Sequence, residues 1–278
     1  MCGVKCIAWI SALLLLASNG IKISILFKSY AVFEFSVKKW QAMRTEYLEA
    51  LREARSDARP LLTALSVVNL FSWFFLGLLL IQVAWILSRG GKRKVGMHTF
   101  LGVTAVAAAF IEIMGQLMIA GREQMTRFFL SNFEINKWLT QGSEFDYIGD
   151  KAYEVCYIMV DGLMMWIDAF EWFALFMITF VIMISTHSMT QPPLSQAWAA
   201  FGMMVGSLSF VDVLANLLRL GDFATFQVVA GLISVLNTVL LLPIWVLWLG
   251  RQLATTQMPP VVKGAHNHFD ESHAAVLS

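Results

Sequence analysis

The feature that most constrains this chain is a series of long apolar stretches separated by shorter polar segments. Each stretch approaches or exceeds the roughly 20 residues that a helix needs to cross about 30 Å of hydrocarbon. Only 14% of the residues are charged and the mean hydropathy is +0.67, whereas about a quarter of the residues in a soluble domain are charged. We therefore predict an all-α, polytopic integral membrane bundle of about six transmembrane helices. The predicted spans lie near residues 7–27, 61–88, 96–120, 158–185, 197–218 and 226–249.

The polar segments between these stretches are too short to fold alone, so residues 1–250 are predicted to form a single transmembrane helical domain. Residues 251–278 are predicted to be a polar, flexible C-terminal tail. The first stretch also fits a secretory signal peptide, because the small residues Ser18 and Gly20 follow the apolar run after Lys5. We favour an uncleaved span, because apolar residues resume over 21–27.

Residues 37–58 carry an amphipathic pattern. Trp40, Tyr47 and Leu51 recur at spacings typical of one helix face, with charged residues between them. This pattern predicts an interfacial helix at the membrane surface. Pro60 is predicted to begin the next helix, because a proline in the first turn costs no hydrogen bond.

Orientation follows from the short loop after the second stretch. This loop contains Arg89, Lys92, Arg93 and Lys94 and no acidic residue. Basic short loops stay in the cytoplasm, which places both termini there and segment 121–154 on the opposite side. The predicted location is a plasma or bacterial inner membrane and the predicted partner is the lipid bilayer. The net charge of +1 gives no reason to expect nucleic acid.

Five acidic residues fall within the predicted spans. Ionisable groups inside a membrane cost several kcal/mol, so each one is a functional hypothesis. At a rise of about 1.5 Å per residue, Glu112 lies roughly 24 Å and Asp212 roughly 22 Å from the cytoplasmic end of its span. The fourth span runs the other way, and its acids also fall in the outer half. The candidates for binding a cation or proton are Glu112, Asp161, Asp168, Glu171 and Asp212.

Helical spacing groups these acids on faces. Asp161 and Asp168 are seven residues apart and share a face, with Glu171 about 60° away. Charged faces must turn toward the bundle interior or a water-filled cavity, so we expect an outward-facing acidic crevice between spans three, four and five.

The structural alternative is a polar network, in which Arg219 neutralises Asp212 and Arg122 meets Asp161 or Asp168. A pocket for a polar lipid or an organic cation is a third interpretation of the same acids.

Other residues point to helix packing. Gly202 and Gly206 form a small-x-x-x-small pattern that allows close helix approach, either within the chain or in self-association. Pro243 predicts a kink in the sixth span. Asn69 and Asn237 are polar groups within spans and are expected to bond to neighbouring helices.

The sequence thus favours a channel-like or transporter-like protein whose crevice binds or passes a cation or proton. The alternative is a non-catalytic structural or assembly subunit of a membrane complex, with other membrane subunits as partners. Enzyme activity is not indicated, because no nucleophile elbow, phosphate loop or zinc-hydrolase motif is present. No cofactor and no metal site are predicted.

Overall fold

The computed structural model describes residues 2–28, 44–89, 95–139, 143–219 and 232–255, and every secondary-structure element in these residues is a helix. The all-α prediction is therefore confirmed. The elements are α1 (Cys2–Lys28), α3 (Arg44–Arg89), α4 (Val95–Leu139), α5 (Ser143–His187), α6 (Gln196–Arg219), the π-turn η3 (Asn237–Leu241) and α8 (Leu242–Thr255).

Six helical segments are long and apolar enough to cross a membrane, which indicates an integral membrane protein. Their bounds agree with the sequence-based spans to within a few residues where both are described. Residues 220–231, which include the predicted start of the sixth span, lie outside the described part of the chain. The six segments are Lys5–Ile25, Asp57–Ser88, Gly96–Gln124, Gly162–His187, Gln196–Leu218 and Leu232–Leu253.

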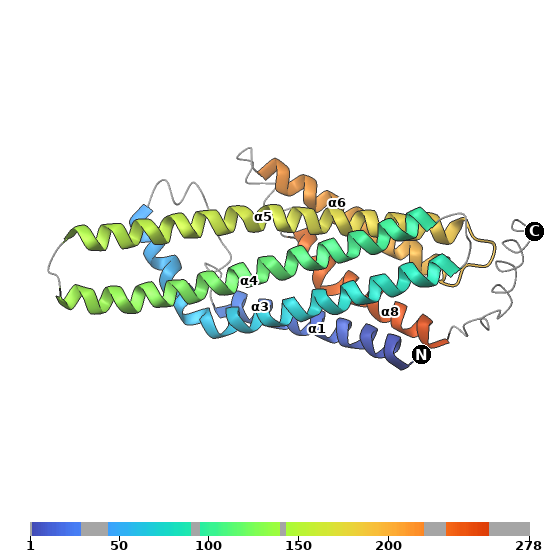
Figure 1. Ribbon diagram of the computed structural model, residues 1–278, viewed down its shortest axis with the longest axis horizontal. Coiled ribbons are helices and arrows are strands. Elements are labelled where there is room, and N and C mark those ends of the chain that lie inside the picture. Colours follow the sequence, from blue (N-terminus) through green and yellow to red (C-terminus); the bar gives the residue numbers. More distant parts are fainter. Residues whose placement is uncertain (1, 29–43, 90–94, 140–142, 220–231, 256–278) are drawn as a thin grey trace, which may run out of the picture.

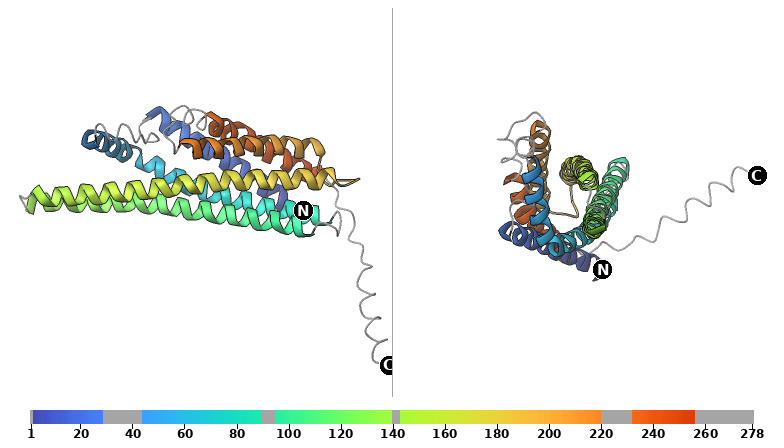
Figure 2. Two further views of the ribbon diagram at one scale, coloured as in Figure 1. Left: turned by 90° about the horizontal axis from the view of Figure 1, so that it is seen from above. Right: turned by 90° about the vertical axis from the view of Figure 1, so that its left-hand side faces the viewer.

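The helices form a ring in which chain neighbours are mostly spatial neighbours. α1 packs against α3, α3 against α4, α4 against α5, and α5 against α6. α8 closes the ring by packing against α1 and, less extensively, against α6. Figure 1 shows the helices side by side, and Figure 2 gives the end-on view. The start of α1 and the end of α8 lie at one end of the bundle, as an even number of spans requires.

The core between α6 and α8 is built around two tryptophans. The rings of Trp198 and Trp245 are fully buried and stacked, with centroids 5.0 Å apart and planes 4° apart. Trp198 Nε1 donates a hydrogen bond to the Trp245 carbonyl at 3.0 Å, so the buried indole N–H of Trp198 is satisfied. Gly202 makes room for this pair, since a Cβ there would lie 2.6 Å from Trp245 Nε1.

The prediction that Pro60 begins a helix is wrong. α3 runs without interruption from Arg44 through Pro60 into the second span. Proline in a helix interior removes the hydrogen bond to the carbonyl four residues earlier. Pro60 is exposed close to Asp57, where the span begins, and water at a membrane surface can satisfy that carbonyl. Residues 44–58 are helical as predicted, whereas Trp40 and the side chains of Tyr47 and Leu51 lie outside the described residues.

Two helices continue well beyond their apolar spans. α4 extends from the end of its span at Gln124 to Leu139, and α5 begins at Ser143, before its span starts at Gly162. At about 1.5 Å per residue these extensions are roughly 22 and 28 Å long. They run side by side at the end of the bundle opposite the α1 start (Figure 1).

Candidate functional site

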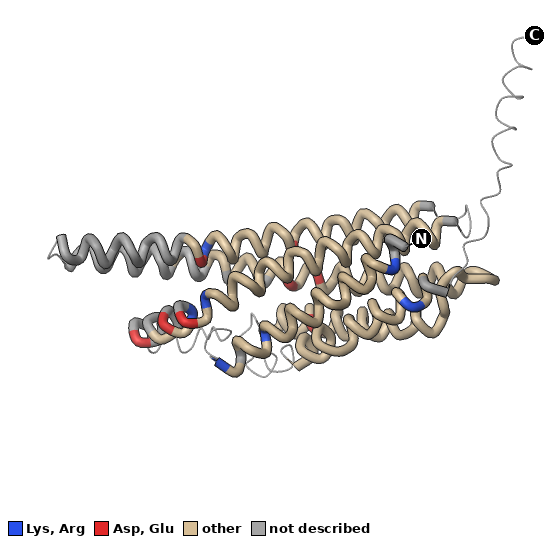
Figure 3. Tube along the Cα trace, turned by 90° about the horizontal axis from the view of Figure 1, so that it is seen from below, with Lys and Arg blue, Asp and Glu red and all other residues tan. Residues whose placement is uncertain are grey.

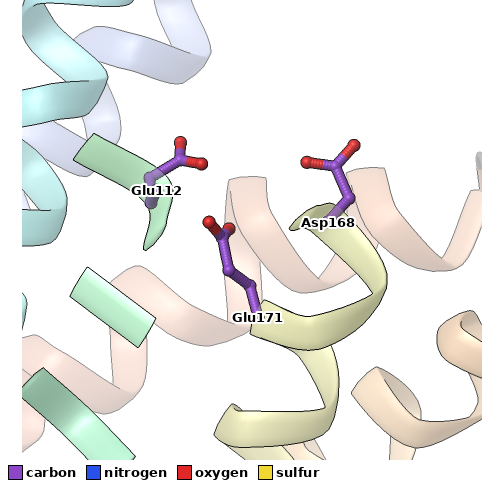
Figure 4. Close-up of side chains that lie close together, drawn as sticks. All are labelled: Glu112, Asp168 and Glu171. Atoms are coloured by element: carbon purple, nitrogen blue, oxygen red, sulfur yellow. The ribbon is translucent and has the colours of Figure 1, made fainter. Parts of the chain in front are cut away.

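Three of the acidic residues come together between α4 and α5. Glu112 of α4 and Asp168 and Glu171 of α5 each offer a carboxylate oxygen, and these oxygens all lie within 4.8 Å of one another. Figure 4 shows the three side chains converging from the two helices. We call these residues the acidic triad. Figure 3 shows the acidic positions inside the bundle as isolated red marks in long uncharged segments.

Two members of the triad are almost completely buried. Glu112 and Glu171 are each 4% exposed, whereas Asp168 is exposed. Gln116 Nε2 donates to Glu112 Oε1 at 2.8 Å. Glu112 Oε2 and Glu171 Oε1 are buried without a donor when both acids are ionised, and the two carboxyl groups lie within hydrogen-bonding reach of each other. Unsatisfied buried carboxylate oxygens are costly unless a cation or a proton reaches them.

Asp168 and Glu171 were predicted to share an inward orientation, and the structure separates their environments. The two residues are three apart in α5, so their side chains leave the helix about 60° apart. Glu171 faces α4, and Asp168 stands at the edge of this contact. The triad therefore has a buried part and an exposed part.

A basic residue stands near the triad on a third helix. Lys22 of α1 is half-buried, and its positive charge acts on Glu171. Residue spacing within one helix does not connect Lys22 to the acids, because the link depends on how α1 packs against α3 and α3 against α4.

Asp212 is not part of the triad. It is 2% exposed on α6, where Asn216 Nδ2 donates to its Oδ2 at 3.3 Å. The α5–α6 contact is occupied by other groups: Phe176 and Phe210 stack with centroids 4.9 Å apart, and Gly206 packs against Thr179. The side chains of Asp161 and Arg219 lie outside the described residues.

The buried face of α4 continues to the membrane boundary. Glu123 shares the face of Glu112 and Gln116, as the spacing predicts, and all three are buried. Glu123 Oε1 forms ion pairs with Arg55 Nη1 of α3 at 3.0 Å and Arg122 Nη2 at 3.4 Å. Glu123 is held between two arginines. It is therefore an example of the structural polar network that was the alternative to an ion site.

Polar groups also join α1, α3, α6 and the sixth span. Ser18 Oγ donates to Asn69 Oδ1, and Asn19 Nδ2 donates to the Thr238 carbonyl at 2.7 Å. Asn237 Nδ2 donates to Ser209 Oγ at 2.7 Å. The expectation that Asn69 and Asn237 bond to neighbouring helices is met. Sequence reasoning missed Asn19, whose only signal was its place inside a span.

The triad can hold a hard cation or a proton. Carboxylate oxygens are the preferred ligands of Mg²⁺, Ca²⁺ and Mn²⁺, and clustered carboxylates also share protons. The six spans and these buried acids define a multi-pass helical membrane protein with an intramembrane acidic site. No protein-family model, no curated protein and no solved structure matches the chain.

Proposed function

We propose that the acidic triad binds a cation or relays protons, and that the protein works as a channel or transporter for that ion. The observation that carries this proposal is the convergence of three carboxylate oxygens from two helices within 4.8 Å. Two unit charges 4 Å apart interact by about 4 kcal/mol at an effective dielectric constant of 20. An ionised triad therefore favours any cation that can enter.

Burial and exposure within the triad support a route for the ion. Counting from the outer span ends Gly162 and Gln124, Asp168 lies roughly 9 Å, Glu171 roughly 14 Å and Glu112 roughly 18 Å along its helix. The exposed acid is thus the one closest to the surface, and the two buried acids lie deeper. An ion would meet Asp168 first and then Glu171 and Glu112.

Lys22 supports the proposal in a different way. A single lysine brings one positive charge within reach of Glu171, whereas Glu112 and Glu171 together carry two negative charges when ionised. Lys22 alone cannot neutralise both buried acids. A proton or a cation is required to make the buried part of the triad neutral.

A second candidate function rests on the extensions of α4 and α5. Two paired helices that continue roughly 22 to 28 Å beyond their spans are not needed to cross the membrane, and they offer a surface for another subunit. In this case the chain is a structural or assembly subunit. The triad would then hold its two helices together without moving an ion.

Flux through reconstituted vesicles tests the first function. The purified chain is incorporated into lipid vesicles, and proton and cation movement is followed with pH-sensitive and ion-sensitive dyes under defined gradients. We expect flux in the parent protein and at least about tenfold less in Glu171→Gln and Glu112→Gln. Glu53→Gln is the matched control, because Glu53 is exposed on α3 before its span begins. Equal flux in both triad variants, or none in the parent under any gradient, contradicts the proposal.

The stability of the same variants separates the two functions. If the triad is an ion site, removing one charge relieves repulsion, so Glu171→Gln unfolds at the same temperature as the parent or higher. Functional sites commonly have this trade-off between stability and activity. If the triad is structural, Glu171→Gln unfolds at a lower temperature. Thermal unfolding of the purified proteins in one detergent measures the difference.

A further inference from the structure

The sixth span contains an irregular turn where it packs against α6. In the π-turn η3 the Leu242 N–H donates to the Asn237 carbonyl, one residue further back than in an α-helix. The next residue, Pro243, has no N–H to give. The Thr238 carbonyl is therefore left without a donor from its own helix, and Asn19 Nδ2 of α1 fills this position at 2.7 Å. The sequence predicted a kink at Pro243, and the structure places the irregular turn directly before it.

The π-turn places Asn237 against polar groups of α6. Asn237 Nδ2 donates to the Val205 carbonyl at 3.2 Å and to Ser209 Oγ at 2.7 Å. The Ser209 hydroxyl donates in turn to the Val205 carbonyl at 2.9 Å. Asp212 is three residues beyond Ser209, so it lies on the same face of α6 one turn further along. Asn237 therefore contacts Ser209 directly, and Asp212 follows Ser209 by one turn on the same helix face.

Asn237 and Asp212 each carry a buried oxygen without a hydrogen-bond donor. Asn237 is 1% and Asp212 is 2% exposed. Asn237 Oδ1 and Asp212 Oδ1 accept no hydrogen bond from the residues that the structure describes. The amide nitrogen of Asn237 is fully used by α6, so its oxygen has to be satisfied by something else. A buried amide oxygen and a buried carboxylate oxygen without hydrogen-bond donors cost folding free energy.

We propose a second ion site, formed by Asp212 and Asn237 around Ser209, that binds one small monovalent cation such as Na⁺. Carboxylate, amide and hydroxyl oxygens are hard ligands. π-turns inside helices are frequently found at functional sites. The site offers one carboxylate, so one positive charge balances it, whereas the triad offers three. This site is separate from the triad and does not depend on whether the triad moves an ion.

Thermal unfolding in matched salts tests the proposal. The purified full chain in detergent is heated in choline chloride, NaCl, LiCl, KCl or MgCl₂ at equal ionic strength. A ligand that binds the folded state raises the unfolding temperature in a saturable way. We expect such a rise with Na⁺ at concentrations where choline has none. Equal shifts in every salt would reflect ionic strength alone and would overturn the site.

Three variants locate the effect. Asp212→Asn keeps the side-chain shape and removes the charge, so its Na⁺-dependent rise should disappear. Ser209→Ala removes one neutral oxygen, so the Na⁺ concentration for half the effect should increase several-fold. Glu53→Gln should keep the full Na⁺ effect, because Glu53 is exposed on α3 outside both sites. A Na⁺-dependent rise that is undiminished in Asp212→Asn, or that is lost in Glu53→Gln, overturns the assignment.

Two further outcomes are decisive. If Asp212→Asn does not fold, the affinity for ²²Na⁺ is measured in the parent and in Ser209→Ala instead. Equal affinity of the two proteins overturns the site. If the parent gains stability on acidification and none from Na⁺ at any pH, Asp212 holds a proton and the cation site does not exist.

Discussion

Asn19 of α1 donates a 2.7 Å hydrogen bond to the backbone carbonyl of Thr238, a residue 219 positions further along the chain. Asn19 is 4% exposed, and the carbonyl that it reaches is the one that the π-turn and Pro243 leave without a helical donor. The Asn19 side chain thus satisfies a backbone carbonyl of a different helix. It also fixes the position of α1 beside the sixth span.

Replacing Asn19 by alanine should destabilise the bundle. The variant leaves the Thr238 carbonyl buried without a donor, which costs about 1–3 kcal/mol of the free energy of unfolding. Unfolding in mixed micelles with increasing SDS measures this change. Ser24→Ala is the control on the same helix, because the exposed Ser24 hydroxyl donates to the Gly20 carbonyl one turn earlier in α1. Equal stability of the two variants would show that the Asn19 bond contributes nothing.

Gly206→Ala should separate α5 from α6. A methyl group at Gly206 would overlap the Thr179 hydroxyl and lie 3.2 Å from Phe176 Cα. Overpacking of this kind costs about 1–3 kcal/mol. Thr179→Ala should restore part of the loss in the double variant. The control is Gly162→Ala, since a Cβ at Gly162 meets nothing within 4 Å among the described residues. The same SDS titration reports all four proteins, and a Gly206→Ala protein as stable as Gly162→Ala contradicts the prediction.

Glu123→Gln should weaken the contact between α3 and α4 at the membrane boundary. The variant removes the carboxylate that Arg55 and Arg122 share, and the side chains of these residues are 11% exposed or less. Breaking a buried ion pair on one side costs about 3 kcal/mol. The free energy of unfolding should fall accordingly, whereas Glu53→Gln, an exposed acid on α3, should be neutral. A loss no larger than in that control would mean that the pairs do not stabilise the boundary.

Topology is tested by labelling. The positive-inside rule places the loop 89–94 in the cytoplasm, and the loop between α4 and α5 is predicted on the opposite side. Single cysteines at Lys92→Cys and Thr140→Cys are made in a chain whose own three cysteines are changed to serine. A membrane-impermeant maleimide applied to intact cells should label the second position and spare the first. Labelling of both positions from the same side excludes the six-span arrangement.

The class of fold was predictable because span length depends on local sequence alone. The pairing of Glu112 with Glu171 followed from their depth and from the need to bury charge away from lipid. The position of Asp212 was not predictable in the same way. Which neighbour its helix face meets is decided by contacts such as the stacked rings of Phe176 and Phe210.

Two backbone features were predicted wrongly or only in part. Pro60 lies inside α3 at an exposed position close to the start of its span, where water can replace the lost bond. The irregular turn before Pro243 was predicted only as a kink, and the hydrogen bond from Asn19 to the Thr238 carbonyl was not predicted, because no local window contains both residues. Hydrogen bonds between residues so far apart in the sequence can be identified only from the three-dimensional arrangement of the helices.

The position of α1 between α3 and α8 has a consequence for how the chain is made. Ala8 of α1 packs where a Cβ on Gly250 of α8 would lie 3.0 Å from its methyl group. α1 therefore completes this contact only after α8, which is synthesised later, has been inserted. Until residues 232–255 have been inserted, the Ala8 face and the Asn19 amide of a nascent chain are presented to lipid. A chain that stops before the sixth span therefore lacks the partner of this face of α1.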